Sequence, residues 1–354
     1  SETNSMVFVG DPDFELQVNF QPNASTTPTG YVADTGAVYG ARGNGYTYGW
    51  NALANETRDR GAVADQRWDT LNHMDDAKYG SDRTWEVGVP DGTYRVYVVM
   101  GDPSYTDQEN VVDVEGTVIE DPDGEDHRDE YMAVVEVSDG RLSIQPGSGS
   151  DNAKINYVHI QQVDRRPYDE EGGEVVIEAE TPMDVRQGND ADDGPSYGYD
   201  MSGYSFVPVD ESAASGDRAL YAYPDHEVNS DDTKNGQRLD YEVDFDTTGT
   251  YYVWVRMKCA NYNDDSVHVG LDETVESYGG YGLSGCSGAS GYTWANRVSS
   301  FWTSMPVEID VTSTGTHTFN IWMREDGVYV DKIILTTDPG FTPSGEGPDE
   351  SERT

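Results

Sequence analysis

GTYRVYVVM, residues 92–100, and GTYYVWVRM, residues 249–257, share the pattern G-T-Y-x-V-x-V-x-M and lie in opposite halves of the chain. Both stretches are rich in β-branched and aromatic residues, which are typical of β-strands. The two halves also end in similar apolar segments, residues 154–160 and 328–335. A pattern that recurs in this way indicates an internal duplication with a period near half the chain.

Other segments carry strand patterns as well. Residues 14–20, 238–245 and 316–323 alternate apolar and polar side chains, so each should bury one face. Gly and Pro clusters separate these segments, and we find no long amphipathic helical stretch. We therefore predict an all-β protein made of two tandem β-sandwich domains of jelly-roll type.

The chain has 354 residues, which is enough for about two domains. Residues 164–173 are charged, contain Pro and Gly and lack periodicity, which is typical of a linker. The predicted domains are therefore residues 6–163 and residues 174–337. Residues 338–354 are rich in Pro, Gly and acids, and predict a flexible tail or a spacer within a larger multidomain parent chain.

The chain is strongly acidic, with 67 Asp and Glu against 22 Lys and Arg, a net charge of −45 and a pI near 4.1. This charge disfavours nucleic acid and anionic membranes as partners, because phosphates would be repelled. No apolar run approaches the roughly 20 residues of a membrane span, so we expect no membrane insertion. A self-repelling surface that is poor in lysine predicts a halophilic source, although such a surface can also serve solubility alone.

The chain contains two cysteines, Cys259 and Cys286. If the protein is secreted, they can form one disulfide; the alternative is a pair of free thiols. Two sequons, at Asn23 and Asn55, permit N-glycosylation in a suitable host.

Carboxylates mark the ends of the second half. Glu178 and Glu180 lie two residues apart in a predicted strand, so they share one face, and Asp331 lies in the last strand. First and last strands often neighbour each other in a jelly roll, so the three side chains can converge. Hard oxygen ligands of this kind suit Ca²⁺, whereas the alternative is an ordinary solvated face.

The E-A-E segment, the second G-T-Y strand and the closing GVYVDKIIL segment resemble carbohydrate-binding modules of families 6 and 35 over about residues 174–337. This resemblance implies a structural calcium held by Glu178, Glu180 and Asp331. It also implies a sugar site in the loops at one end of the sandwich. The implied sugar-binding residues are Tyr197, Tyr199, Tyr204, Trp294 and Trp302, together with Asn261, Asn263 and Asp326. Many family members carry an Asn before the final Asp, where this chain has Val330.

The first half resembles malectin-type, galactose-binding-like domains through residues 36–40, 46–51, 94–102 and 154–156. This resemblance implies secretion and a second sugar site. The implied stacking platform and the residues that fix hydroxyl groups are Tyr39, Tyr46, Tyr48 and Trp50, with Asp102 or Asn156. The alternative is that these loop aromatics fold back onto the end of the sandwich.

Residues 120–126 form an acidic turn that could coordinate a cation but lacks the spacing of an EF-hand, so we favour a solvated hairpin tip. The sequence has no H-E-x-x-H motif and no phosphate-binding loop, and its histidines are scattered, so we expect no enzymatic activity.

The sequence thus predicts a secreted or cell-surface, non-catalytic protein that binds a polysaccharide or glycan. The alternative is a structural subunit of an extracellular filament or matrix, in which the same sandwiches contact copies of the chain. A third possibility is a spacer that presents another part of a longer protein.

Overall fold

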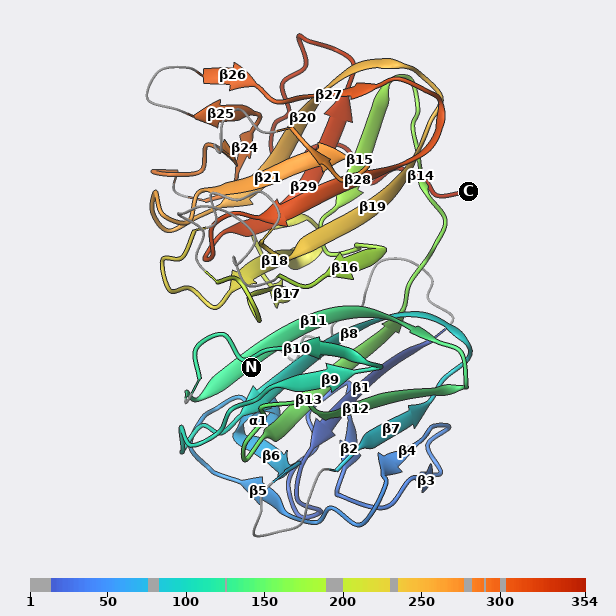
Figure 1. The fold of residues 1–354 in the computed structure, drawn as a ribbon, viewed down its shortest axis with the longest axis vertical. Helices are drawn as coiled ribbons and strands as arrows, with labels where there is room; N and C mark the ends of the chain where they lie inside the picture. Colours follow the sequence, from blue (N-terminus) through green and yellow to red (C-terminus); the bar gives the residue numbers. More distant parts are fainter. Residues whose placement is uncertain are drawn as a thin grey trace. The chain divides into compact units, whose positions relative to one another are not determined.

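The computed structural model describes residues 14–75, 83–124, 126–188, 200–229, 235–276, 282–289, 291–299 and 304–354. The predicted sugar-binding residues Tyr197, Tyr199 and Trp302 lie outside these ranges. The chain divides into two compact units, residues 1–164 and 165–354 (Figure 1). Both units are built from β-strands, so the all-β prediction is confirmed. Within the described ranges, no helix is long and apolar enough to cross a membrane.

The first unit is a sandwich of two sheets. One sheet has the strand order β11-β8-β13-β1-β2, with β6 beside β13 and β5 beside β6, and the other has the order β10-β9-β12-β7-β4-β3. The strands are β1 Glu15–Phe20, β2 Val32–Asp34, β3 Gly40–Ala41, β4 Thr47–Trp50, β5 Thr57–Asp59, β6 Thr70–His73, β7 Trp85–Gly88, β8 Gly92–Gly101, β9 Val112–Val114, β10 Thr117–Ile119, β11 Arg128–Val137, β12 Arg141–Pro146 and β13 Lys154–Gln162. A four-residue helix, α1 Gln66–Asp69, precedes β6.

The second unit repeats this plan. Its sheets have the orders β14-β19-β28-β21-β23-β25-β26, with β16 beside β19 and β22 beside β21, and β17-β18-β29-β20-β24, with β15 beside β29 and β27 beside β20. The strands are β14 Tyr168–Asp169, β15 Glu174–Glu178, β16 Asp184–Arg186, β17 Ser205–Asp210, β18 Arg218–Tyr223, β19 Arg238–Phe245, β20 Gly249–Lys258, β21 Ser266–Leu271, β22 Thr274–Val275, β23 Leu283–Ser284, β24 Thr293–Ala295, β25 Arg297–Ser299, β26 Ser304–Pro306, β27 Glu308–Val311, β28 Gly315–Met323 and β29 Tyr329–Thr336. A short 3₁₀ turn, Ser215–Asp217, precedes β18.

The two copies of the G-T-Y pattern are the interior strands β8 and β20. Every second residue of each strand faces the core, because side chains alternate across a sheet. Each strand pairs antiparallel with the last long strand of its unit, β13 or β29 (Figure 1). The core-facing residues, all buried, are Tyr94, Val96, Val98 and Met100 in the first unit and Tyr251, Val253, Val255 and Met257 in the second.

The C-terminal segment corrects one expectation from the sequence. Residues 338–354 were predicted to be flexible, yet they pack along the second unit. Ser351 exchanges hydrogen bonds with the backbone of Val176 in β15, and the guanidinium of Arg353 lies 3.8 Å from the centroid of the Tyr168 ring. Tyr168 belongs to β14, so much of the predicted linker is also part of the second unit.

Candidate functional site

Three aspartates from separate loops meet at one end of the second sandwich. Asp225 follows β18, Asp264 precedes β21, and Asp326 lies between β28 and β29. Each offers one carboxylate oxygen, and the three oxygens lie within 4.8 Å of one another. The strand order makes this possible, because β18 and β29 are neighbours in one sheet and β21 and β28 are neighbours in the other.

The backbone and one amide hold these aspartates in place. Asp326 accepts hydrogen bonds from the backbone N–H groups of His226, at 2.6 Å, and Val228, at 2.9 Å. The Asn261 side-chain amide donates to Asp264 Oδ2 at 2.7 Å, while the buried Asp264 Oδ1 has no hydrogen-bond partner. An ion that binds there would supply the interaction that this oxygen lacks.

Gly327 permits the close approach of the carboxylates. Its φ is +72°, and a Cβ at this position would lie 2.9 Å from Asp264 Cγ and 3.1 Å from Asp225 Cγ. Any other residue would therefore be strained and would push the two carboxylates apart.

The electrostatics of this cluster favour a bound cation. Burial raises the pKa of Asp326 to about 7, and the charges of Asp225 and Asp264 act in the same direction. Burial, together with the charge of Asp225, also raises the pKa of Asp264. A divalent cation would reverse both effects, because it stabilises the ionised carboxylates.

Tyrosine rings flank the three aspartates. Tyr221 of β18 and Tyr329 of β29 are cross-strand partners whose ring centroids lie 4.5 Å apart, and both side chains are partly exposed. The Lys258 ammonium lies 4.0 Å from the centroid of the Tyr329 ring. Tyr262, beside Asn261, is 75% exposed. Flat ring faces next to fixed carboxylates are suited to stack on a sugar ring and to bind its hydroxyl groups.

Residues 168–350 match the family model described as "Glycosyl hydrolase family 115 C-terminal domain". This range is slightly more than half of the 354 residues. The chain belongs to this family. The matched range covers nearly the whole second unit and contains the three-aspartate cluster, so the candidate site lies within the family 115 C-terminal domain.

Other similarities are more distant. The chain is 30% identical over 206 residues to "Uncharacterized protein P23" of Formosa agariphila, and the match covers 51% of this chain and 48% of that protein. The chain thus spans about half the length of this relative. Similar solved structures include the C-terminal family 6 module of LamC from Zobellia galactanivorans, with 18% identity, a TM-score of 0.28 and coverage of 46% of this chain and 99% of that one. A family 35 carbohydrate-binding module from Clostridium thermocellum has 16% identity, a TM-score of 0.29 and coverage of 46% and 98%. These TM-scores are too low to bear on function.

Some residues of this candidate site were among those that the sequence analysis had named. Asn261 and Asp326 were predicted to bind sugar and lie in or beside the cluster, and Asn263 donates its backbone N–H to Asn261 Oδ1 at 2.7 Å. The sequence analysis missed Asp225, Asp264 and Tyr221. The signal for the aspartates was only their place after or before a strand, and acids are too frequent in this chain for that to be distinctive.

Of two other predicted sugar contacts in the same domain, Tyr204 is corrected and Trp294 stays partly exposed. Tyr204 is 4% exposed and lies beside His226, so its ring has little free surface. The Trp294 indole N–H donates to the backbone oxygen of Gly345 at 3.1 Å, and Gly347 packs against the Trp294 ring. The C-terminal segment therefore covers part of this tryptophan. Val330, at the position where many modules of families 6 and 35 carry an Asn, is fully buried.

The predicted calcium ligands Glu178, Glu180 and Asp331 do converge, but two of them have cationic partners. Lys332 Nζ lies 2.8 Å from Glu178 Oε1, and Arg256 pairs with Asp331. Burial raises the pKa of Asp331 to about 6 despite this arginine. Glu178 Oε2 and Glu180 Oε2 are nevertheless buried without a hydrogen-bond partner, and burial and the charge of Glu178 raise the pKa of Glu180. Calcium binding at this triad therefore stays a prediction.

The aromatic platform predicted in the first unit is wrong for its two central members. Trp50 is fully buried and Tyr48 is 2% exposed, because the strand β4 carries both rings into the sandwich core. The Trp50 indole donates to Asp34 Oδ1 at 2.8 Å. Tyr46 packs partly against the same core, and the Arg141 guanidinium covers the Tyr39 ring at 4.3 Å from its centroid.

The polar partners predicted for that platform are also occupied. Asp102 is buried and pairs with Arg60. The buried Asn156 amide donates to the backbone oxygens of Trp68, at 3.1 Å, and Thr70, at 2.8 Å. Neither side chain is placed to fix a sugar hydroxyl.

The remaining predicted features are the disulfide and the two glycosylation sites. Cys259 and Cys286 form a disulfide with 5.7 Å between their Cα atoms. Asn23 and Asn55 are both exposed, which leaves room for a glycan at each sequon.

Proposed function

We propose that this chain is a secreted, non-catalytic glycan-binding protein whose sugar site is the Asp225, Asp264 and Asp326 cluster with its flanking tyrosines. The observation that carries the proposal is the buried, unpartnered Asp264 Oδ1 within a three-carboxylate cluster beside a partly exposed tyrosine pair. The disulfide supports secretion, because such bonds persist in oxidising compartments.

We propose that calcium binds this cluster, whose carboxylates lack, among the described residues, the lysine and arginine partners found at the Glu178, Glu180 and Asp331 triad. The cluster supplies hard oxygen ligands, and no side-chain cation pairs with Asp264 or Asp326 in the described part of the chain. When bound, calcium would supply further coordination positions for sugar oxygens. Asn261 would hold Asp264 in position, and the backbone N–H groups of His226 and Val228 would do the same for Asp326.

The tyrosines would provide the apolar part of the site. Tyr221 presents ring surface next to the carboxylates, while Lys258 covers part of the Tyr329 ring and holds it in place. Sugar C–H faces stack on such rings, while hydroxyl groups bind to the carboxylates.

A binding role agrees with the family to which the chain belongs, because its name describes a domain that accompanies a glycosyl hydrolase. Gly194-Pro-Ser-Tyr-Gly198 has the spacing of a serine nucleophile motif, but it lies outside the described residues. No apolar strand pattern precedes it, and that strand context is what would support a catalytic interpretation.

The test is a glycan array of plant, algal and microbial polysaccharides, probed with the full chain in Ca²⁺ and in EDTA. Wild type should bind a defined glycan class in Ca²⁺, and EDTA or Asp264→Asn should abolish the signal. Asp310→Asn, the same change at an exposed position of β27, is the matched control and should bind like wild type. Silence across the panel, or equal binding by Asp264→Asn, would contradict the proposal.

A further inference from the structure

An acidic side chain lies on the core-facing side of β11 in the first unit. Asp129 is fully buried and lies two residues before the buried Tyr131, so the alternation of the strand turns both toward the interior. Asn110 Nδ2 donates to Asp129 Oδ2 at 2.7 Å, but Asp129 Oδ1 is buried without a hydrogen-bond partner. A carboxylate oxygen left in this state is costly unless something binds it.

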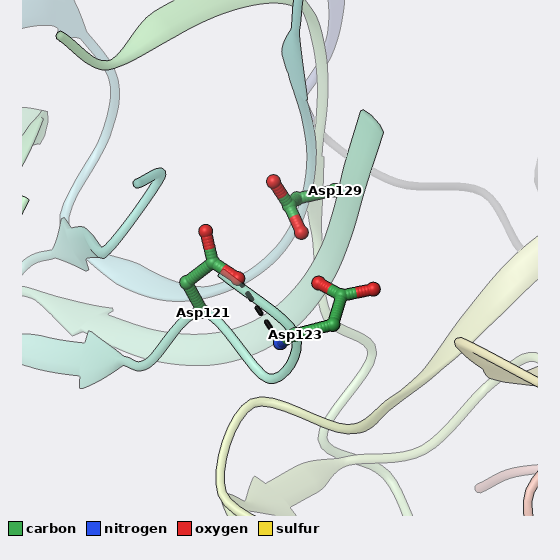
Figure 2. Close-up of side chains that lie close together, drawn as sticks. All are labelled: Asp121, Asp123 and Asp129. Atoms are coloured by element: carbon green, nitrogen blue, oxygen red, sulfur yellow. Dashed lines mark hydrogen bonds between the residues drawn. The ribbon is translucent and has the colours of Figure 1, made fainter. Parts of the chain in front are cut away.

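The loop between β10 and β11 closes over this oxygen with two more carboxylates (Figure 2). Asp121 anchors the loop: its Oδ2 accepts from Asn110 N at 2.8 Å and its Oδ1 from the backbone of Asp123 and Gly124, at 3.2 and 2.8 Å. Gly124 has a φ of +73°, which the tight turn requires. The result is that Asp121, Asp123 and Asp129 each offer an oxygen within 4.8 Å of the others.

The basic residues nearby have other partners. Arg128 Nε lies 2.8 Å from Glu130 Oε1, and the Arg128 guanidinium lies over the Trp68 ring. Lys154 pairs with Asp107 at 2.9 Å. In the described part of the chain, neither Asp121 nor Asp129 forms an ion pair.

The acids therefore repel one another. Burial raises the pKa of Asp129 well above its usual range, and the charges of Asp121 and Asp126 raise it further. Burial also raises the pKa of Asp123 to about 7, again with Asp126 and Asp121 as neighbours. A cation between these carboxylates would offset their mutual repulsion and supply a partner for the buried Asp129 Oδ1.

We infer that Asp121, Asp123 and Asp129 form a site for a divalent cation such as Ca²⁺. The bound ion would fix the β10–β11 loop to the core of the first unit. All ligands are carboxylate oxygens, the donor set of Ca²⁺, whereas Zn²⁺ prefers nitrogen and sulfur. The Asn110 amide orients the buried carboxylate from behind and leaves its other oxygen facing the loop. This site is independent of the sugar site, since its residues lie in the other unit.

Two variants with a matched control test this inference in the full chain. Asp129→Asn removes the buried charge, and Asp123→Asn removes a loop ligand without changing the core. Asp139→Asn makes the same change at an exposed turn after β11 and is the control. All three are combined with Asp264→Asn, so that the cation proposed for the second unit does not interfere.

Calorimetric titration with CaCl₂ should show one binding site fewer in Asp129→Asn and Asp123→Asn than in the Asp139→Asn control. Thermal unfolding gives a second readout. In Ca²⁺, the chain with Asp129→Asn should unfold at a lower temperature than the chain with Asp264→Asn alone. In EDTA at pH 8 it should unfold at the same or a higher temperature, because the substitution removes a buried charge that is repelled by its neighbours. If both variants bind as many Ca²⁺ ions as the control, the inference is overturned and the carboxyl groups instead share protons.

The same titration shows separately whether the cation site proposed in the second unit is absent. In that case Asp264→Asn alone would bind as many Ca²⁺ ions as wild type, while the loss in Asp129→Asn would persist.

Discussion

Asn156 in β13 and Asp331 in β29 occupy the same bulge in the two units. In the first unit, Ile155 pairs with Met100 and Tyr157 with Val99, so Asn156 is the extra residue. In the second, Val330 pairs with Met257 and Lys332 with Arg256, so Asp331 is the extra residue. The duplication thus extends to an irregularity of the sheet, and an amide in one unit replaces a carboxylate in the other.

The surroundings of the two residues differ accordingly. Asp331 pairs with Arg256, whereas Val99 stands at the matching place in β8. By the same registers, Asn19 of β1 lies opposite Tyr157, and Glu178 of β15 lies opposite Lys332. The first unit therefore has neutral groups where the second has paired charges.

Asn156→Asp should destabilise the first unit. The new carboxylate would face the backbone oxygens of Trp68 and Thr70 without an arginine, and an uncompensated buried charge of this kind costs about 3–5 kcal/mol. Urea unfolding at pH 7.5 measures the loss. Asn51→Asp, the same change at an exposed residue, should shift the free energy of unfolding by less than about 0.5 kcal/mol. Equal free energies of unfolding for Asn156→Asp and Asn51→Asp would contradict the conclusion that the surroundings of Asn156 cannot hold a charge.

Trp50→Ala should separate stability from binding. Removal of a fully buried tryptophan costs about 3–5 kcal/mol, and Asp34 Oδ1 would lose its indole donor as well. Below the unfolding transition, glycan affinity should stay unchanged, because the sugar site is in the second unit. Leu53→Ala, at a residue 57% exposed, is the stability control. A loss of affinity in folded Trp50→Ala would restore the aromatic platform of the first unit as a binding site.

The His317–Asp272 pair should make stability depend on pH. Asp272 Oδ2 lies 2.7 Å from His317 Nδ1, and this hydrogen bond raises the pKa of the imidazole above its ordinary value. The folded chain then binds the proton more tightly than the unfolded chain. The gain in stability is therefore complete below the unfolded pKa, about 6.5, and disappears as the pH rises through the folded value.

NMR titration of the histidines checks this pair directly. In Asp272→Asn the pKa of His317 should fall toward about 6.5, while the other histidines titrate as in wild type. A His317 pKa that does not respond to the substitution would show that the hydrogen bond is not formed in solution.

Salt should stabilise the whole chain. A net charge of −45 favours the expanded state through self-repulsion, and screening reduces that repulsion. The free energy of unfolding should rise as KCl increases from about 0.1 M to several molar, where the Debye length falls below about 3 Å. Including EDTA throughout separates screening from the proposed calcium sites. Stability that is flat in KCl would leave the acidic surface with solubility as its only role.

The strands were predictable because the pattern of apolar and polar residues within each strand is enough to identify it. GTYRVYVVM and GTYYVWVRM become β8 and β20, and residues 238–245 become β19, because alternation within a few residues decides which face is buried. For Tyr48 and Trp50 the alternative interpretation, that the loop aromatics fold back onto the sandwich, is the one that holds, although the glycine-rich segment gave no sign that it forms the strand β4. Asp225, Asp264 and Asp326 span 101 residues of the chain (326 − 225), and only the pairing of strands brings them together.

Asp129 is an intermediate case. The turn at residues 120–126 was interpreted as a solvated tip, since its acids looked exposed. The alternation of RDEYMAVVEV in β11 places Asp129 on the same face as Tyr131, and this was a local signal that a carboxylate faces the core. What the sequence lacked was the fold of the loop over that face.

The central claim is that the partly exposed tyrosine pair and the three aspartates form one sugar site. Its most direct test is calorimetric titration of wild type, Tyr221→Ala and Asp264→Asn with the glycan that wild type binds on the array, in Ca²⁺. We predict that Tyr221→Ala lowers the affinity at least about tenfold, or 1.4 kcal/mol, at unchanged unfolding temperature, and that Asp264→Asn abolishes binding. Affinities equal to wild type in both folded variants would contradict the account.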